Sequence, residues 1–149
     1  MIRDTIVVHH SLTKDSGTVS WAAIERFHRE TNGWADTGYH AGLELVADLP
    51  GTSFYSYQAL IGRAIDLKAA ACPQGNMNER GLHVCCVGNF DDIEPSNVLL
   101  ERLVERVIRP WMRIYHIHPD RILGHRDFNS AKSCPGRRFD LERVRRMVR

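Results

Sequence analysis

The sequence predicts an α/β fold: a single domain whose central mixed β-sheet is flanked by helices. Short apolar segments rich in β-branched residues, which are typical of buried strands, alternate with segments whose apolar residues recur at helical spacing. Of the 149 residues, 43% are hydrophobic and 26% charged, which suits one globular domain with its own core. Since no repeat, low-complexity tract or linker divides the chain, we expect one domain over residues 1–149.

The first elements that we expect are a strand, a helix and a second strand. Residues 4–9 form an apolar run that ends in the polar pair His9-His10, at the kind of strand end where functional groups often lie. Residues 39–46 are predicted to form the second strand. Between them, a helix capped by Ser20 ends near Asn32-Gly33. Its predicted buried face carries Trp21, Ile24, Phe27 and His28.

The middle of the chain contributes two further strands. Residues 57–71 are ambiguous, because their composition favours a helix whereas the aromatic and turn-rich stretch before them favours a strand. We adopt a strand over residues 56–61. Residues 82–87 are predicted to form another strand, bounded by Gly81 and Gly88.

The last third of the chain is predicted to form the longest helix, a short strand and a closing helix. Residues 96–115 carry an apolar stripe at helical period, and Pro110 within it predicts a kink or an early end. Residues 122–123 suit a short strand that leads to Gly124-His125. Asp140 can cap a helix over residues 140–149, with Leu141, Val144 and Val148 on its buried side.

Composition and charge exclude several kinds of function. Lys and Arg total 20 against 18 Asp and Glu, and a net charge of +2 argues against nucleic acid as the main ligand. No apolar run approaches the roughly 20 residues of a membrane span, so we expect no membrane insertion. The first residues show no secretory signal pattern, which predicts synthesis in the cytoplasm. Four cysteines in such a chain indicate reduced thiols or a metal ligand rather than a disulfide framework.

Two imidazoles and one thiolate form a candidate metal centre. His9 ends a predicted strand, and His125 is followed nine positions later by Cys134. Three protein ligands and one open position characterise catalytic zinc sites, and this nitrogen and sulfur set suits zinc better than calcium or magnesium. Each of these residues alone is more often a packed core residue, and their spacing matches no short zinc signature. The residues by themselves therefore support only a candidate site.

Five motifs, in the same order, resemble those of the type 2 N-acetylmuramoyl-L-alanine amidases, which include the bacteriophage T7 lysozyme-like and peptidoglycan recognition protein-like domains. The resemblance spans nearly the whole chain. The motifs are Val7-Val8-His9-His10-Ser11, Gly38-Tyr39-His40, residues 78–88 closing on Val87-Gly88-Asn89-Phe90, Gly124-His125-Arg126-Asp127 and Lys132-Ser133-Cys134-Pro135-Gly136.

The resemblance implies zinc ligation by His9, His125 and Cys134 and catalytic roles for Tyr39 and Lys132. His10 should point to the opposite face of the strand, because neighbouring strand residues alternate. Some branches of the family carry a glutamate at the position of Cys85. Its absence here indicates the phage branch.

Two further residues are candidate substrate contacts. Asn78 resembles a substrate-contacting loop position, although a turn residue explains it nearly as well. His83 stands where the family commonly has a small residue, and by alternation it shares a face with Cys85, so we expect it to line the substrate groove.

The implied function is hydrolysis of the amide between the lactyl group of N-acetylmuramic acid and L-alanine in peptidoglycan. A phage or prophage endolysin, acting as a monomer on the host wall after release, is the expected setting. The alternatives are a cytoplasmic muropeptide-recycling amidase, a non-catalytic peptidoglycan-binding module and a domain with structural zinc. Retention of Cys134 argues against the non-catalytic module, whose members generally lose the cysteine.

Overall fold

A five-stranded sheet forms the centre of the computed structural model, which describes residues 1–13, 20–48 and 55–149. Its strands are β1 (Thr5–His10), β2 (Ala41–Asp48), β3 (Tyr55–Ile61), β4 (Gly81–Cys86) and β5 (Ile122–Gly124). They lie in the order β3-β2-β4-β1-β5. β1 is parallel to β4 and β5, and β2 is parallel to β4 but antiparallel to β3. The predicted mixed sheet is confirmed, with the strand over residues 56–61 at its edge.

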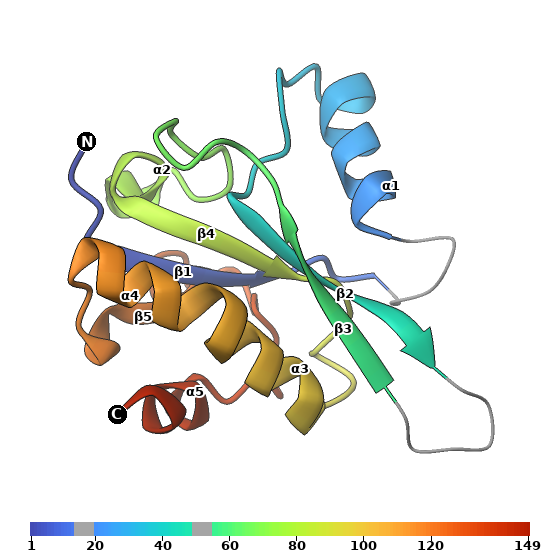
Figure 1. Ribbon diagram of the computed structural model, residues 1–149. Coiled ribbons are helices and arrows are strands. Elements are labelled where there is room, and N and C mark those ends of the chain that lie inside the picture. Colours follow the sequence, from blue (N-terminus) through green and yellow to red (C-terminus); the bar gives the residue numbers. More distant parts are fainter. Residues whose placement is uncertain (14–19, 49–54) are drawn as a thin grey trace.

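One face of the sheet is covered by the long helical segment and the closing helix (Figure 1). The long segment consists of α3 (Asn97–Leu103), a π-helical turn (Val104–Ile108) and α4 (Arg109–Tyr115), and the closing helix is α5 (Leu141–Val148). Side chains such as Leu99, Leu103 and Val144 pack there against Val8 and Val84. Burial of this apolar surface supplies most of the driving force for folding.

Pro110 does not end the long helix, contrary to one of the two predicted outcomes. The helix continues to Tyr115, and its irregular part is the π turn at Val104–Ile108, directly before the proline. A proline lacks the N–H that an α-helix needs and crowds the carbonyl four residues earlier. A widened turn at this place relieves that crowding, so the stripe of apolar residues stays continuous against the sheet.

The other face of the sheet is covered by the first helix and by loops. This helix comprises α1 (Trp21–Arg26) and a π turn (Phe27–Thr31), and the Ser20 side chain accepts a hydrogen bond from the N–H of Ala23 as the predicted cap. Trp21 packs against Cys85 and Val87 of the sheet face. Phe27 is exposed, so its predicted place on the buried face is wrong; the π turn that begins there changes the angular spacing that we assumed.

Short helical turns complete the chain: residues Gln74–Asn76, α2 (Met77–Arg80), Pro119–Arg121 and His125–Asp127. Asp140 caps α5 as predicted, since its carboxylate accepts a hydrogen bond from the N–H of Arg143 at 3.0 Å. None of the four cysteines forms a disulfide. Within the described ranges, no helix is both long and apolar enough to cross a membrane.

Candidate metal centre

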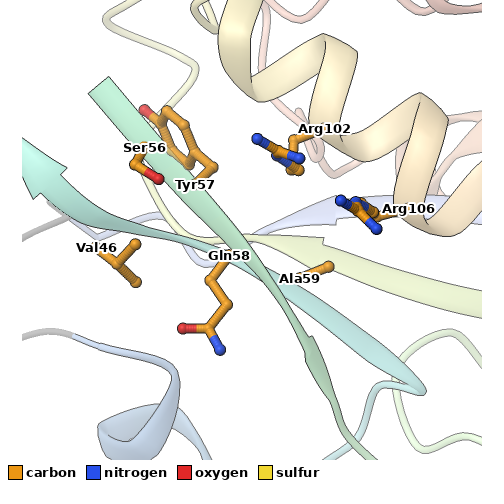
Figure 2. Close-up of a pocket in the computed structure, with 7 residues that line it drawn as sticks. All are labelled: Val46, Ser56, Tyr57, Gln58, Ala59, Arg102 and Arg106. Carbon is orange, nitrogen blue, oxygen red and sulfur yellow. The ribbon is translucent and has the colours of Figure 1, made fainter. Parts of the chain in front are cut away.

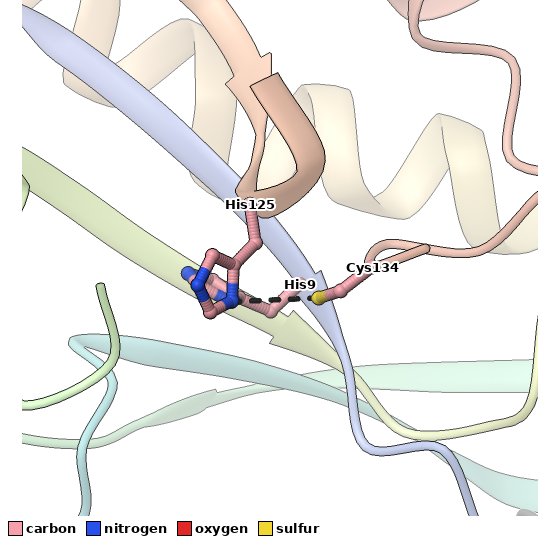
Figure 3. A group of neighbouring side chains, drawn as sticks. All are labelled: His9, His125 and Cys134. Carbon is pink, nitrogen blue, oxygen red and sulfur yellow. Dashed lines mark hydrogen bonds between the residues drawn. The ribbon is translucent and has the colours of Figure 1, made fainter. Parts of the chain in front are cut away.

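The candidate metal centre forms where two parallel strands end side by side. His9 lies near the end of β1, and His125 directly follows β5, which pairs with β1 in parallel. Cys134 approaches from the loop that follows. Ligand atoms of these three residues all lie within 4.8 Å of one another (Figure 3). The structure therefore brings together the three residues that the resemblance selects.

The loop that carries Cys134 is fastened to the turn that carries His125. The N–H of Arg126 donates to the carbonyl of Cys134 at 2.8 Å, and the Arg126 side chain donates to the Phe139 carbonyl at 3.0 Å. Gly124 allows the close approach, because a Cβ there would lie 2.5 Å from Cδ of Pro135. Backbone contacts thus fix the spacing between two of the three ligand atoms.

Strand alternation separates His9 from His10, as predicted. His9 points into the cluster, with its Nδ1 3.6 Å from Sγ of Cys134. His10 lies against the opposite face, where its Nδ1 accepts a hydrogen bond from the N–H of Phe90 at 3.2 Å and its ring stacks on Phe90. The backbone N–H of His10 also donates to Sγ of Cys134 at 3.4 Å. His10 therefore supports the cysteine through its backbone rather than acting as a second imidazole ligand.

Burial keeps the two imidazoles of the candidate metal centre in their neutral form. Burial lowers the pKa of His9 well below 6.5, and the neighbouring His83 and His125 lower it further. Burial also lowers the pKa of His125, with a smaller effect from Lys132. Both imidazoles are therefore neutral, which is the form that binds a metal.

A metal would change the state of two groups in this cluster, the thiol of Cys134 and one ring nitrogen of His125. Burial raises the pKa of Cys134 to about 11, more than its hydrogen bond from His10 and the charges of Lys132 and Arg126 lower it. In the described part of the chain, Nε2 of His125 is buried without a hydrogen-bond partner. A divalent cation would stabilise the thiolate and give the cluster a common partner. Two imidazoles and one thiolate are ligands that zinc accepts readily.

A pocket of about 230 Å³ opens over this cluster. Tyr39 and Lys132 line it together with the three candidate ligands, so both predicted catalytic residues stand beside the metal centre. Leu12 and Ala71 also line the pocket, and neither was predicted from the sequence. Leu12 follows β1 closely and is 57% exposed. An exposed leucine directly after a functional strand end is the signal that identifies such a residue in retrospect.

Tyr39 lies just before β2 with its ring next to His9. The two ring centroids are 5.1 Å apart. Burial raises the pKa of Tyr39 well above 10, and the neighbouring thiols of Cys85 and Cys134 add to the effect. The hydroxyl therefore keeps its proton and is a hydrogen-bond donor at neutral pH.

Lys132 is exposed at the rim of the pocket, two residues before Cys134. Its backbone N–H donates to the Asn129 carbonyl at 3.0 Å, which holds the turn that carries it. The backbone of Lys132 is thus fixed by the turn, while its ammonium group reaches solvent. This arrangement allows the cation to contact an incoming ligand.

Neither His83 nor Asn78, the two candidate substrate contacts, is among the residues that line this pocket. His83 is fully buried beneath His9, so the prediction that it lines the groove is wrong. Strand alternation places its side chain on the same face of the sheet as the site, but His9 covers it. The side-chain oxygen of Asn78 accepts hydrogen bonds from the N–H groups of Ala71 and Cys72 at 2.9 and 2.8 Å. Asn78 therefore holds the loop that borders the pocket instead of lining the pocket itself.

A larger pocket, of about 410 Å³, lies between β3 and the long helical segment (Figure 2). Its described lining includes no histidine, cysteine or carboxylate, so it offers no comparable set of metal ligands. The lining residues are Val46, Ser56, Tyr57, Gln58, Ala59, Arg102 and Arg106. Of these two pockets, only the smaller one holds the candidate metal ligands.

Solved structures with the same fold include two amidases and several peptidoglycan recognition proteins. N-acetylmuramoyl-L-alanine amidase LysC from Clostridium intestinale URNW superposes with a TM-score of 0.75 at 23% identity, over 98% of this chain and 85% of that one. Drosophila PGRP-LB superposes with a TM-score of 0.70 at 22% identity, over 92% of this chain and 76% of that one. These likenesses confirm the predicted fold.

Sequence comparison adds the family. An N-acetylmuramoyl-L-alanine amidase from Sus scrofa is 30% identical over 115 residues, which cover 76% of this chain and 17% of that protein. The endolysin of Escherichia phage T7 is 33% identical over 89 residues, which cover 60% of this chain and half of that protein. The family model described as N-acetylmuramoyl-L-alanine amidase matches residues 2–137. The chain therefore belongs to the N-acetylmuramoyl-L-alanine amidase family.

Proposed function

We propose that this chain is a zinc-dependent amidase that hydrolyses the amide between the lactyl group of N-acetylmuramic acid and L-alanine in peptidoglycan. The observation that carries the proposal is the grouping of His9, His125 and Cys134 within 4.8 Å in the pocket that Tyr39 and Lys132 also line. This set combines metal ligands, a neutral hydroxyl donor and a cation around one space, which are the parts that amide hydrolysis needs.

Hydrolysis adds the hydroxyl of water to the carbonyl carbon, breaks the carbon–nitrogen bond and leaves a proton on the departing amine. Zinc, when bound by His9, His125 and Cys134, lowers the pKa of a water molecule and polarises a carbonyl group. A hydrogen-bond donor directed at the carbonyl oxygen stabilises the negative charge that develops there. A general acid protonates the departing amine.

Tyr39 is assigned as the donor to the carbonyl oxygen. Its hydroxyl stays protonated because burial raises its pKa, and its ring is held against that of His9. A donor fixed in place before the reaction stabilises the developing charge without reorganising, which is where such a group contributes most.

Lys132 is assigned as the acid for the leaving amine. Its side chain is exposed and lines the pocket at its rim, from which it can reach an amine that leaves the site. Its charge also favours the developing negative charge on the carbonyl oxygen.

We propose phage or prophage lysis as the setting of this activity, with a monomeric enzyme that acts on the host wall. The 33% identity to the T7 endolysin and the thiol of Cys85 where other branches carry glutamate support this setting over muropeptide recycling. Cys134, placed among the other two ligands, supports catalysis over recognition without cleavage.

Digestion of purified peptidoglycan, followed by mass spectrometry, tests the proposal. New free alanine amino termini should appear, disappear with a chelator and return with added zinc. New reducing sugar ends would instead identify a glycosidase and refute the proposal.

A cysteine pair provides the matched control. Cys134→Ser should abolish most cleavage and zinc binding. Cys86→Ala should retain both, because Cys86 lies in the core on the opposite face of the sheet. Equal activity of wild type and Cys134→Ser would show that the thiolate is no ligand.

A further inference from the structure

A second buried histidine stands directly behind one of the candidate ligands. Nδ1 of His83 lies 2.9 Å from Nε2 of His9, and the two rings stack with an interplanar angle of 27°. On its other side, Nε2 of His83 lies 2.8 Å from the carbonyl oxygen of Met77. His83 is fully buried, so neither contact competes with solvent.

The carbonyl of Met77 determines which nitrogen carries the proton in each ring. A carbonyl oxygen only accepts, so Nε2 of His83 must donate to it. In a neutral imidazole the other nitrogen, Nδ1, then has a lone pair and accepts. The facing Nε2 of His9 must therefore be the donor, which leaves the lone pair of His9 on Nδ1. That Nδ1 is the atom that faces Sγ of Cys134.

The backbone around His83 keeps the ring in this place. Its N–H donates to Nδ1 of His40 at 3.0 Å. Gly81 leaves room for the ring, because a Cβ there would lie 2.6 Å from Nε2 of His83 and 2.7 Å from the Met77 carbonyl oxygen. The imidazole is therefore held by its neighbours and is not free to turn over.

We propose that His83 is a positioning residue of the metal centre, which keeps the proton of His9 on Nε2 and so presents the Nδ1 lone pair of His9 to the metal. This inference rests on the proposed zinc site. Hydrogen-bond acceptors behind a ligating imidazole fix its tautomer and its orientation and raise its basicity. Such acceptors are usually carboxylates or carbonyls. Here the acceptor is the imidazole of His83, whose own tautomer is set by its hydrogen bond to the Met77 carbonyl.

The reverse polarity would require a cationic His83 that donates from both nitrogens. Burial lowers the pKa of His83 to about 3, more than its contact with the Met77 carbonyl raises it. His40, Arg3 and His125 also disfavour a positive charge there. The direction of the hydrogen bond between His83 and His9 therefore follows from the acceptor at the other nitrogen of His83, the Met77 carbonyl.

A measurement on the zinc-free protein tests the tautomer directly. The ¹⁵N chemical shifts of the imidazoles at neutral pH should show His9 protonated on Nε2 and unprotonated on Nδ1. His83→Leu fills the space but offers no acceptor, so the preference of His9 should be lost. Wild-type protein with His9 protonated on Nδ1 would overturn the proposal, whatever the protein does with zinc.

Zinc affinity, measured by competition with a chromophoric chelator, tests the consequence. Loss of a partner behind a ligand typically weakens metal binding about 10- to 100-fold, and we expect that loss in His83→Leu. His83→Asn should recover most of it, because the amide oxygen can take the place of Nδ1 as acceptor. Unchanged affinity in His83→Leu would overturn the proposal.

A third buried histidine separates positioning from general destabilisation. His28 accepts a hydrogen bond from the N–H of Gly38 and contacts the Thr37 hydroxyl, and its ring packs on Tyr39 rather than on a candidate ligand. His28→Leu should lower stability yet leave zinc affinity unchanged; an equal loss of affinity in both variants would reduce His83 to a structural residue. If wild type itself bound no zinc, the proposed function would fail, while the tautomer measurement would still decide the role of His83.

Discussion

Acid should destabilise this fold through His40, because backbone groups hold both of its ring nitrogens in the neutral state. Nδ1 accepts a hydrogen bond from the N–H of His83 at 3.0 Å, and Nε2 lies 2.9 Å from the Leu67 carbonyl oxygen, to which it donates. A proton added to Nδ1 would break the first bond. It would also place a cation beside Arg3, whose guanidinium is 3.4 Å away.

The size of the effect follows from the pKa. Burial, with help from Arg3 and Arg63, lowers the pKa of His40 from 6.5 to about 4, although the Leu67 carbonyl raises it. As the pH falls, His40 therefore becomes protonated near pH 6.5 in the unfolded chain but only near pH 4 in the folded protein. This stabilisation is complete above pH 6.5 and is lost as the pH falls towards 4. Between pH 7 and 4.5 the loss is roughly 2 kcal/mol.

Urea unfolding at several pH values measures this loss, with a chelator present so that metal release adds no pH dependence of its own. His40→Asn removes the titrating group and can keep an acceptor for the N–H of His83. The free energy of unfolding should therefore fall less between pH 7 and 4.5 in His40→Asn than in wild type, by roughly 2 kcal/mol.

The exposed His116 provides the control, since His116→Asn removes an imidazole without touching the buried cluster. Asparagine also tolerates the left-handed conformation of this residue, whose φ is 54°. The reasoning fails if His40→Asn and wild type lose the same free energy over this pH range.

Three further outcomes are expected. Tyr39→Phe and Lys132→Met should each lower the turnover of peptidoglycan by about 10²-fold or more while leaving zinc affinity near that of wild type, because neither residue is a proposed ligand; parallel losses of zinc would contradict these roles. Leu103→Ala should cost about 2–5 kcal/mol in the free energy of unfolding, because the side chain is fully buried in the main core; a cost below 1 kcal/mol would contradict that packing. Gly42→Ala should destabilise the fold by about 1–3 kcal/mol, because its Cβ would lie 2.3 Å from the ring of Trp21, and unchanged thermal unfolding would show that the indole yields easily.

Elements whose signal is local could be predicted from the sequence. β1, β4 and α5 begin and end within a residue or two of the predicted positions, because apolar runs, a glycine boundary and the cap at Asp140 define them. The exposure of Phe27 could not be predicted, since the π turn that begins there alters the helical period on which the prediction relied.

The candidate ligands could be predicted only in part. The residues alone offered His9, His125 and Cys134 as weak candidates, and family resemblance selected them. Pairing of β1 with β5 explains why they meet, because parallel strands deliver their carboxyl ends to one edge of the sheet. Neither the pairing nor the return of the Cys134 loop over Gly124 is visible in a single sequence.

The role of His83 depends on strand register, which is a property of residues more than 70 positions apart. In the parallel pairing of β1 with β4, Val7 lies opposite His83, and His9 lies opposite Cys85. Alternation then gives all four side chains the same face, and an imidazole at position 83 is long enough to reach the ring of His9 from behind. A shift of the register by one residue would turn His83 into the main core, where it would need a polar partner. The register that brings His83 to the face of the sheet that carries His9 therefore supplies His9 with its hydrogen-bond acceptor, so the strand pairing that builds the site also sets the tautomer of one candidate ligand.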